Sequence, residues 1–232
     1  HELLEKLPNF RKRMDWILNN KPELANLVSH WEVEGRGGKL LMSVLRKNRL
    51  TRVLNRMVDE NEFLSDFGIR SMSKVYAENP YVFSVDGKDF TVKYTPAESD
   101  SSMFGGNSNW RGPIWFPINF LIVESLQRFF YYYGDNLQIE YPAKSGAMRN
   151  LDYVATDLSQ RLYSIFKSDE KGNRAFNGGN DLLNHNEFFK NYIMFHEYFN
   201  GDTGKGIGAS HQTGWTATIA KLIQPRMGSR PR

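Results

Sequence analysis

The chain has 232 residues, of which 40% are hydrophobic and 24% charged, a composition typical of a globular domain with a hydrophobic core. Its net charge of +4 comes from basic and acidic residues that are scattered along the sequence, without the basic face or module of a nucleic-acid-binding protein. There is no cysteine, which excludes disulfides, thiolate metal sites and a cysteine nucleophile. The longest apolar stretch, residues 114–123, is about half a membrane span. We expect no nucleic-acid partner, no membrane partner and, as no Asn-x-Ser/Thr sequon is present, a cytoplasmic location.

Helical patterns follow one another along the chain. Apolar spacing, proline at helix starts and polar residues between the segments predict helices over residues 10–19, 23–30, 40–58, 117–133, 151–167, 186–198 and 211–222. The segment 117–133 is apolar on nearly all sides, which predicts that it is buried. One hairpin is expected within residues 82–94, because Asp86-Gly87 can adopt the positive φ angles of a tight turn. The predicted fold class is all-α with one β-hairpin excursion.

Three irregular segments between the helices contain the residues best suited to chemistry, since functional residues often lie on loops held by a rigid scaffold. These segments are residues 65–73, with Asp66; residues 105–115, with Asn109, Trp110, Arg111 and Trp115; and residues 195–216, with Glu197, a Gly-rich turn, His211 and Trp215. A carboxylate can activate water, guanidinium and amide groups can bind hydroxyls, and an apolar aromatic floor suits a sugar ring. This inventory, in a chain with 14% aromatic residues, is compatible with a sugar site.

Two long motifs make that interpretation specific. The first is Gly-Asn-Ser-Asn-Trp-Arg-Gly-Pro-Ile-Trp-Phe-Pro-Ile-Asn at residues 106–119. The second runs from Glu-Tyr-Phe-Asn-Gly-Asp through the Gly-rich turn to His-Gln-Thr-Gly-Trp-Thr, at residues 197–216. With these motifs the chain resembles, over essentially its whole length, the C-terminal region of glycoside hydrolase family 63. The motifs look most like the bacterial branch of this family, which also contains processing α-glucosidases.

The resemblance implies a fold and a reaction. The fold is an (α/α)6 toroid, in which inner and outer helices surround a pocket, and residues 1–232 would form the C-terminal portion of that catalytic domain. The reaction is hydrolysis of α-linked glucosides or mannosides with inversion, without a cofactor or a metal. The family's general acid is an Asp upstream of every segment present here. We therefore expect the chain to depend on an upstream part of the same polypeptide and to be inactive alone.

The resemblance also assigns roles to individual residues. The general base falls on Glu197. Trp110 and Trp215 match the tryptophans of the family's pocket. Hydroxyl groups of the substrate would be bound by Arg111, by Asn109 and, on a weaker match, by Asp66. His211 would contribute either to the pocket or to packing.

Simpler explanations compete with some of these roles. Glu197 could be a surface acid at a helix end. His196-Glu197 begins a zinc motif, but Asn200 stands where the second histidine is required, so we expect no zinc. The glycines at 204–208 fit no phosphate-loop spacing, which favours a plain turn. Asp202 beside them could bind calcium, although the ligand series of an EF-hand is absent.

Two positions are settled only in part by the sequence. Trp115 lies five residues after Trp110 across Pro113, so we expect the two rings to face different ways and leave Trp115 unassigned. Ser210 precedes a predicted helix and is expected to be its N-cap.

Two other functions remain open. One is a trehalase-type or debranching hydrolase with the same toroid, although such enzymes usually carry other residues in place of the 109–115 run. The other is a non-catalytic carbohydrate-binding or protein-interaction domain. A reading frame that continues upstream and places an Asp in a pocket loop would favour the hydrolase.

Overall fold

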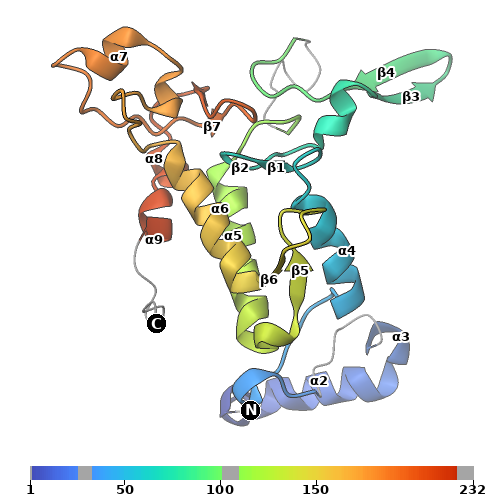
Figure 1. Cartoon of the computed structure of the whole chain (residues 1–232). Coiled ribbons are helices and arrows are strands. Elements are labelled where there is room, and N and C mark those ends of the chain that lie inside the picture. Colours follow the sequence, from blue (N-terminus) through green and yellow to red (C-terminus); the bar gives the residue numbers. More distant parts are fainter. Residues whose placement is uncertain (1, 26–32, 101–109, 224–232) are drawn as a thin grey trace.

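Helices α5 (Phe116–Tyr133) and α6 (Leu151–Ser164) pack against each other at the centre of the computed structural model (Figure 1). The structure describes residues 2–25, 33–100 and 110–223. The α5 segment was predicted to be buried all round, but only one side of it is. Ile118, Leu121 and Tyr131 are exposed on the other side, so this helix has an apolar face that the described residues do not cover.

Local signals in the sequence set the ends of these two helices. Pro117 lies in the first turn of α5, where a missing N–H breaks no helical hydrogen bond. The helix ends at Gly134, whose φ is 56° and whose N–H donates to the carbonyl of Phe130. Asn150 caps α6, since its side chain accepts a hydrogen bond from the N–H of Tyr153 at 2.9 Å. Both helices therefore form where the sequence predicts them.

One apolar core joins α4 (Lys47–Met57), α5 and α6 to strand β5 (Gln138–Glu140), which pairs with β6 (Met148–Asn150). Burial of each such side chain contributes about 1.5–3 kcal/mol, which makes this core the main source of stability. Its fully or almost fully buried members include Leu50, Leu54, Val58, Val123, Leu126, Ile139, Val154, Leu158 and Leu162.

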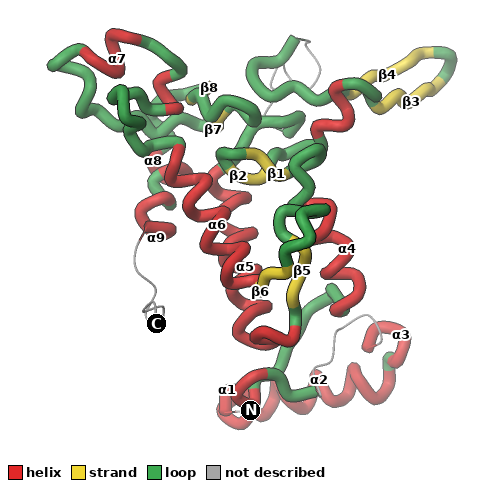
Figure 2. Tube along the Cα trace, viewed as in Figure 1, coloured by secondary structure: helices red, strands yellow, loops and turns green. Residues whose placement is uncertain are grey.

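Apart from α2, the other elements are short (Figure 2). The remaining helices are α1 (Glu2–Lys6), α2 (Pro8–Asn20), α3 (Pro22–Ala25), α7 (Asp181–His185), α8 (Thr213–Thr216) and α9 (Ile219–Ile223), with 3-10 turns η1 (Arg36–Gly38), η2 (Lys74–Ala77), η4 (Gly134–Asn136) and η5 (Ala175–Asn177). The described strands pair into four antiparallel two-stranded sheets: β5 with β6, β1 (Leu64–Ser65) with β2 (Gly68–Ile69), β3 (Tyr81–Val85) with β4 (Lys88–Val92), and β7 (Tyr198–Phe199) with β8 (Gly206–Ile207). The fold is thus mixed, helices with small sheets, and the all-α expectation was too narrow.

Several predicted elements are confirmed. The helices over 10–19, 117–133 and 151–167 correspond to α2, α5 and α6, and the hairpin corresponds to β3–β4. Asp86 and Gly87 have φ angles of 49° and 73°, as the tight turn requires.

Other predicted helices are wrong or only partly right. The helix expected over 40–58 begins at Lys47, and the helix expected over 211–222 is divided into α8 and α9. No helix covers 186–198, where turns lead into β7. Many residues there are aromatic and have a modest helix propensity, and the backbone of residues 195–198 pairs with residues 207–212 instead. Of the helix expected over 23–30, α3 covers the start and the rest lies outside the described residues.

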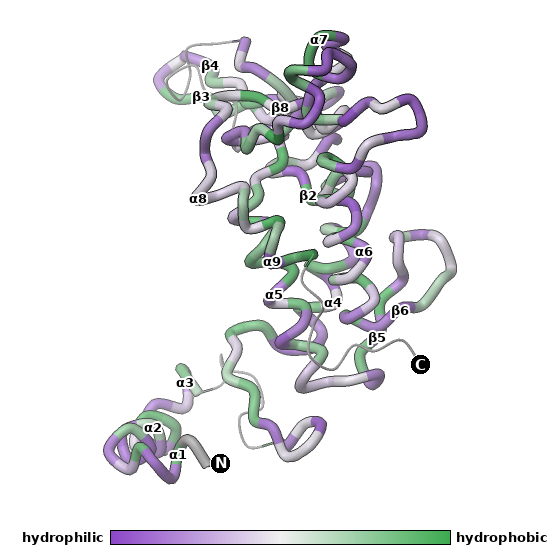
Figure 3. The backbone as a smooth tube through the Cα atoms, turned by 90° about the vertical axis from the view of Figure 1, so that its left-hand side faces the viewer, coloured by the Kyte–Doolittle hydropathy of each residue, from purple (hydrophilic) through white to green (hydrophobic). Residues whose placement is uncertain are grey.

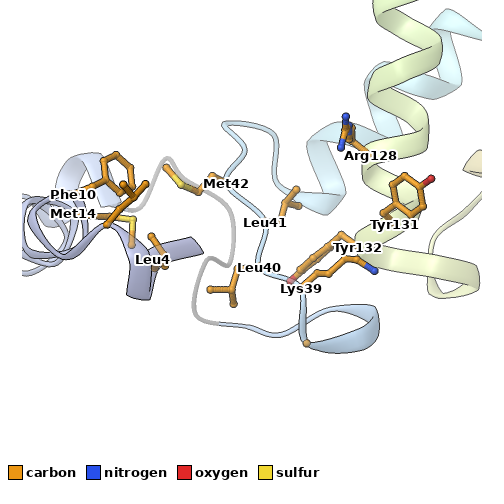
Figure 4. Close-up of a pocket in the computed structure, with 12 residues that line it drawn as sticks. Leu4, Phe10, Met14, Lys39, Leu40, Leu41, Met42, Arg128, Tyr131 and Tyr132 are labelled. Atoms are coloured by element: carbon orange, nitrogen blue, oxygen red, sulfur yellow. The ribbon is translucent and has the colours of Figure 1, made fainter. Parts of the chain in front are cut away.

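The irregular segments gather at one end of the α5–α6 pair, and α1 and α2 lie at the other end (Figures 1 and 3). We call the first end the loop layer; it contains β1–β2, β7–β8, α7, α8 and residues 110–115. At the other end, a mainly apolar cavity of about 1010 Å³ is lined by α1 and α2, by residues 38–42 and by α5 (Figure 4). Within the described ranges, no helix combines the length and the apolar character needed to span a membrane.

Candidate active site

Segments far apart in the sequence meet in the loop layer. Ile114 and Phe199 form an antiparallel bridge in which each N–H donates to the other's carbonyl, at 2.8 and 3.0 Å. Both side chains are fully buried. The bridge therefore fixes the 110–115 segment against β7.

The residues before β7 pair in turn with the segment that follows the Gly-rich turn. The N–H of Glu197 donates to the carbonyl of Ala209, and the N–H of Gln212 donates to the carbonyl of Phe195, each at 2.8 Å. The hydroxyl of Thr216 donates to the carbonyl of His196 at 2.5 Å. As a result, residues 110–115, 195–199 and 209–216 form one assembly.

Three tryptophans lie in contact in this assembly. The ring of Trp115 lies between the other two, with its centroid 4.1 Å from that of Trp110 and 5.2 Å from that of Trp215. The expectation that Trp110 and Trp115 face different ways is wrong, because the chain turns at Gly112, where φ is 147°. Trp110 is 57% and Trp215 36% exposed, so the outer rings offer surface to a ligand.

The Nε1 of Trp115 is buried and has no hydrogen-bond partner among the described residues. A cavity of about 220 Å³ is lined by Trp115 and Trp110 together with Arg70, Ser71 and Asn119. Asn119 is itself buried and holds β2 to α5, since its amide accepts from the N–H of Ile69 and donates to that residue's carbonyl. An apolar wall with a few polar groups is typical of a small-molecule site.

The carboxylate of Glu197 lies against the end of the Gly-rich turn. Its Oε2 accepts a hydrogen bond from the N–H of Ala209 at 3.4 Å. A Cβ on Gly208 would lie 2.7 Å from the same oxygen, so a glycine is needed there. Next to it, burial raises the pKa of the Tyr198 phenol to about 12, with smaller contributions from the charges of Glu98 and Glu197. Glu197 is thus partly buried and close to a neutral phenol.

His196 packs in an apolar environment. Its ring lies 6.4 Å from that of Phe176 and 6.2 Å from that of Phe199. A Cβ on Gly206 would lie 2.2 Å from the imidazole. Both ring nitrogens are buried without a partner in the described part of the chain. Burial lowers the pKa of the imidazole, and the charge of the nearby His211 makes a smaller contribution in the same direction. No group of three or more potential metal ligands occurs among the described residues.

The remaining predicted site residues differ in their surroundings. Arg111 is buried; its carbonyl accepts from the N–H of Thr95 at 2.5 Å, and its guanidinium donates to the hydroxyl of Ser99. Asn109 lies outside the described residues. His211 is exposed, with its Nδ1 2.8 Å from the hydroxyl of Ser210.

Ser210 is not the N-cap that the sequence predicted. Because α8 begins only at Thr213, its N-cap residue is Gln212, and no side chain caps it. The Ser210 hydroxyl contacts the imidazole of His211 instead.

Asp66 lies apart from the tryptophans. It occupies the turn between β1 and β2, its side chain is 89% exposed, and one carboxylate oxygen lies 3.6 Å from Arg161 on α6. Within the described residues, no hydrogen bond or ion pair joins it to Trp110, Trp115 or Glu197, and its role in sugar binding stays a prediction.

A partly buried ion cluster, which sequence reasoning missed, holds the Gly-rich turn in place. Asp202 Oδ1 accepts from Arg70, Lys74 and Tyr94 at 3.1, 3.2 and 3.0 Å. Burial tends to raise the pKa of Asp202, but hydrogen bonds from Lys74 and Arg70 outweigh it, so the pKa is lowered. Cationic and phenolic donors thus occupy the oxygen that the sequence suggested for calcium. No local pattern links residues 70 and 202.

Comparisons with known proteins identify the class to which this site belongs. Residues 39–225 match the model of the glycosyl hydrolase family 63 C-terminal domain. The chain therefore belongs to glycoside hydrolase family 63, as its motifs suggested.

Individual relatives agree with this assignment. An uncharacterized protein of Saccharomyces cerevisiae is 49% identical over 95% of the chain and 21% of its own length. The mannosyl-oligosaccharide glucosidase of the same yeast is 24% identical over 78% of the chain and 16% of its own length. A probable mannosyl-oligosaccharide glucosidase of Schizosaccharomyces pombe is 26% identical over 75% of the chain and 15% of its own length. The chain spans about a fifth or less of these curated relatives.

Proposed function

We propose that residues 1–232 form the C-terminal portion of the catalytic domain of a hydrolase that cleaves α-linked glucosides or mannosides with inversion. The observation that carries the proposal is the contact of Trp115 with Trp110 and Trp215, beside the segment that holds Glu197. Membership of family 63 and similarity to two glucosidases support the same reaction class.

In this proposal, Glu197 is the general base. Its carboxylate takes a proton from a water molecule, whose oxygen attacks the anomeric carbon on the face opposite the leaving oxygen. A carboxylic acid roughly 6.5–9.5 Å away protonates the leaving oxygen. We assign that acid to a part of the polypeptide outside these 232 residues. Two carboxyl groups suffice for the reaction, so no cofactor is required.

The sugar itself would lie on the tryptophans. Trp110 and Trp215 offer ring faces, and the buried Nε1 of Trp115 is a donor that a sugar hydroxyl would satisfy, since buried donors are rarely left unpaired. Arg111, Asn109 and Asp66 are proposed to bind further hydroxyls, with His211 near the rim. The exposed apolar side of α5 supports an (α/α)6 toroid, because it offers a face on which another helix of the ring would pack.

The test uses the longer polypeptide that carries this chain, with an α-glucoside and an α-mannoside as substrates. Proton NMR of the fresh product should show the β-anomer first, and the isolated 232-residue chain should hydrolyse neither substrate measurably. Release of the α-anomer first would mean a nucleophile in place of a base. Hydrolysis by the isolated chain would mean that both carboxyl groups lie within it. Sugar binding without hydrolysis in the longer protein would instead favour a carbohydrate-binding role.

A further inference from the structure

A second polar cavity, of about 690 Å³, lies beside the turn that follows β7. It is lined by the end of α6, by the loop that follows this helix and by the turn itself, and its polar lining includes Lys167, Asp169, Asn173, Arg174, Asn200 and Lys205. Small-molecule sites commonly have volumes of about 300–1,000 Å³. None of these residues belongs to the proposed catalytic set, so the cavity calls for a separate explanation.

The lining of this cavity is electropositive. It contains three cationic side chains, of Lys167, Arg174 and Lys205, and one carboxylate, of Asp169, which leaves an excess of two positive charges. No ion pair of the three cations is found among the described residues.

The one carboxylate forms its hydrogen bonds within its own turn and makes no ion pair with these cations among the described residues. Asp169 accepts from the N–H of Lys171 at 2.9 Å, from the N–H of Asn173 at 2.7 Å and from the side chain of Asn173 at 3.1 Å. The bonds from Asn173 lower the pKa of this carboxyl. Asp169 therefore shapes the loop.

Several lining residues carry hydrogen-bond donors that have no acceptor among the described residues. The stem of Lys205 crosses Gly178, where a Cβ would lie only 2.5 Å from the lysine Cδ and where φ is 59°. Arg174 is held by one hydrogen bond to the carbonyl of Phe166 and has further N–H donors. Asn200 accepts from the N–H groups of Asp202 and Thr203 through Oδ1, so its amide N–H donors face no competing acceptor among the described residues.

We propose that this cavity binds the phosphate group of a small phosphate monoester. Such a group carries a charge of about −1.5 to −2 at pH 7, which matches the excess of two positive charges. Lysine, guanidinium and amide donors form the strong charge-assisted hydrogen bonds that phosphate oxygens accept. The cavity is larger than a bare ion needs, which favours an ester over inorganic phosphate. The proposal is independent of glycoside hydrolysis, because it uses neither Glu197 nor the tryptophans.

Calorimetric titration of the 232-residue chain tests the proposal. Glucose 6-phosphate, inorganic phosphate and glucose serve as probes at constant ionic strength. Saturable binding is expected for the two phosphate species and not for glucose. Tighter binding of glucose 6-phosphate than of inorganic phosphate would support the ester, whereas equal or reversed affinities would overturn that part of the proposal in favour of free phosphate.

Matched variants locate the site. Lys205→Gln and Lys167→Gln should each weaken phosphate binding about tenfold, as expected for loss of one hydrogen bond to a charged group. Lys88→Gln removes the same charge from the exposed hairpin β3–β4, on the other side of the loop layer (Figure 1), and should leave binding unchanged. Absence of saturable phosphate binding, or an equal loss in all three variants, would overturn the proposal. The hydrolysis assay has no bearing on either result.

Discussion

The α5–α6 pair and the loop layer are held together by different interactions. The helices meet through apolar side chains such as Val123 and Leu158, which are completely buried. In the loop layer, buried side chains such as Ile114 and Phe199 extend this core, but segments more than 80 residues apart are also joined by isolated hydrogen-bonded bridges, by the ion cluster around Asp202 and by glycines that allow close approach. Stability should therefore come mainly from the helices, whereas site geometry depends in addition on a few polar contacts. Substitutions in each region test whether stability and site geometry can be separated.

The largest loss of stability is expected in the helical pair. Leu158→Ala removes a completely buried side chain from α6 and should lower the free energy of unfolding by about 2–5 kcal/mol. The same substitution at Leu121, which is 59% exposed on α5, should cost far less. Urea denaturation measures both. Equal losses would mean that the core is not where the structure places it.

In the loop layer, a single methyl group should disturb the site more than the fold. Gly206→Ala places a Cβ 2.2 Å from the ring of His196, and overpacking of this kind costs about 1–3 kcal/mol. The near-ultraviolet circular dichroism of the tryptophans should change with it. Gly214→Ala is the matched control, because no atom lies within 4 Å of its added Cβ. If the two variants behave alike, the glycine turn does not determine the packing of the site.

The ion cluster around Asp202 should contribute less to the free energy of unfolding than the packing at Leu158 or Gly206. Asp202→Asn removes the charge that faces Arg70 and Lys74 and should cost about 1 kcal/mol, a value reduced by the partial exposure of Asp202. Because the folded state lowers the pKa of Asp202, its contribution is present above the ordinary value of 3.8 and is lost as the pH falls through the folded pKa. Asp66→Asn, at an exposed side chain, should change stability little. Acid unfolding of the unsubstituted chain, of Asp202→Asn and of Asp66→Asn, monitored by circular dichroism, separates these outcomes.

The smallest expected effect is the contribution of His196 to the pH dependence of stability. Burial lowers the pKa of its imidazole from 6.5, so the unfolded state binds protons at a higher pH than the folded state. The free energy of unfolding should therefore decrease as the pH falls below 6.5 toward the folded pKa. His196→Phe should remove part of that slope, and His185→Phe, at an exposed position, should leave it in place. An unchanged slope in His196→Phe would show that this ring is not the source.

The difference between the helical pair and the loop layer also explains which features could be predicted from the sequence. The ends of α5 and α6 depend on Pro117, Gly134 and Asn150, which are local signals. The hairpin depends on Asp86-Gly87, also a local signal. The motifs were sufficient to indicate family 63, which the family model confirms.

The contacts of the loop layer could not be predicted in this way. The contact of Trp115 with Trp215 and the grouping of Arg70 with Asp202 join residues about 100 or more positions apart, and no spacing rule reports such a pair. The helix expected over 186–198 failed for the same reason. The backbone at its C-terminal end, residues 195–198, pairs with residues 207–212, and apolar periodicity does not reveal these partners.

The most direct test of the central claim is the substitution Glu197→Gln in the longer polypeptide that carries this chain. The amide keeps the shape of the side chain and loses its basicity, so kcat should fall by about 10²–10⁴-fold while KM changes little. Glu98→Gln is a suitable control, because Glu98 is the other carboxylate close to Tyr198, and it should retain kcat. If Glu197→Gln instead retains kcat, Glu197 is not the general base and the proposed active site is wrong.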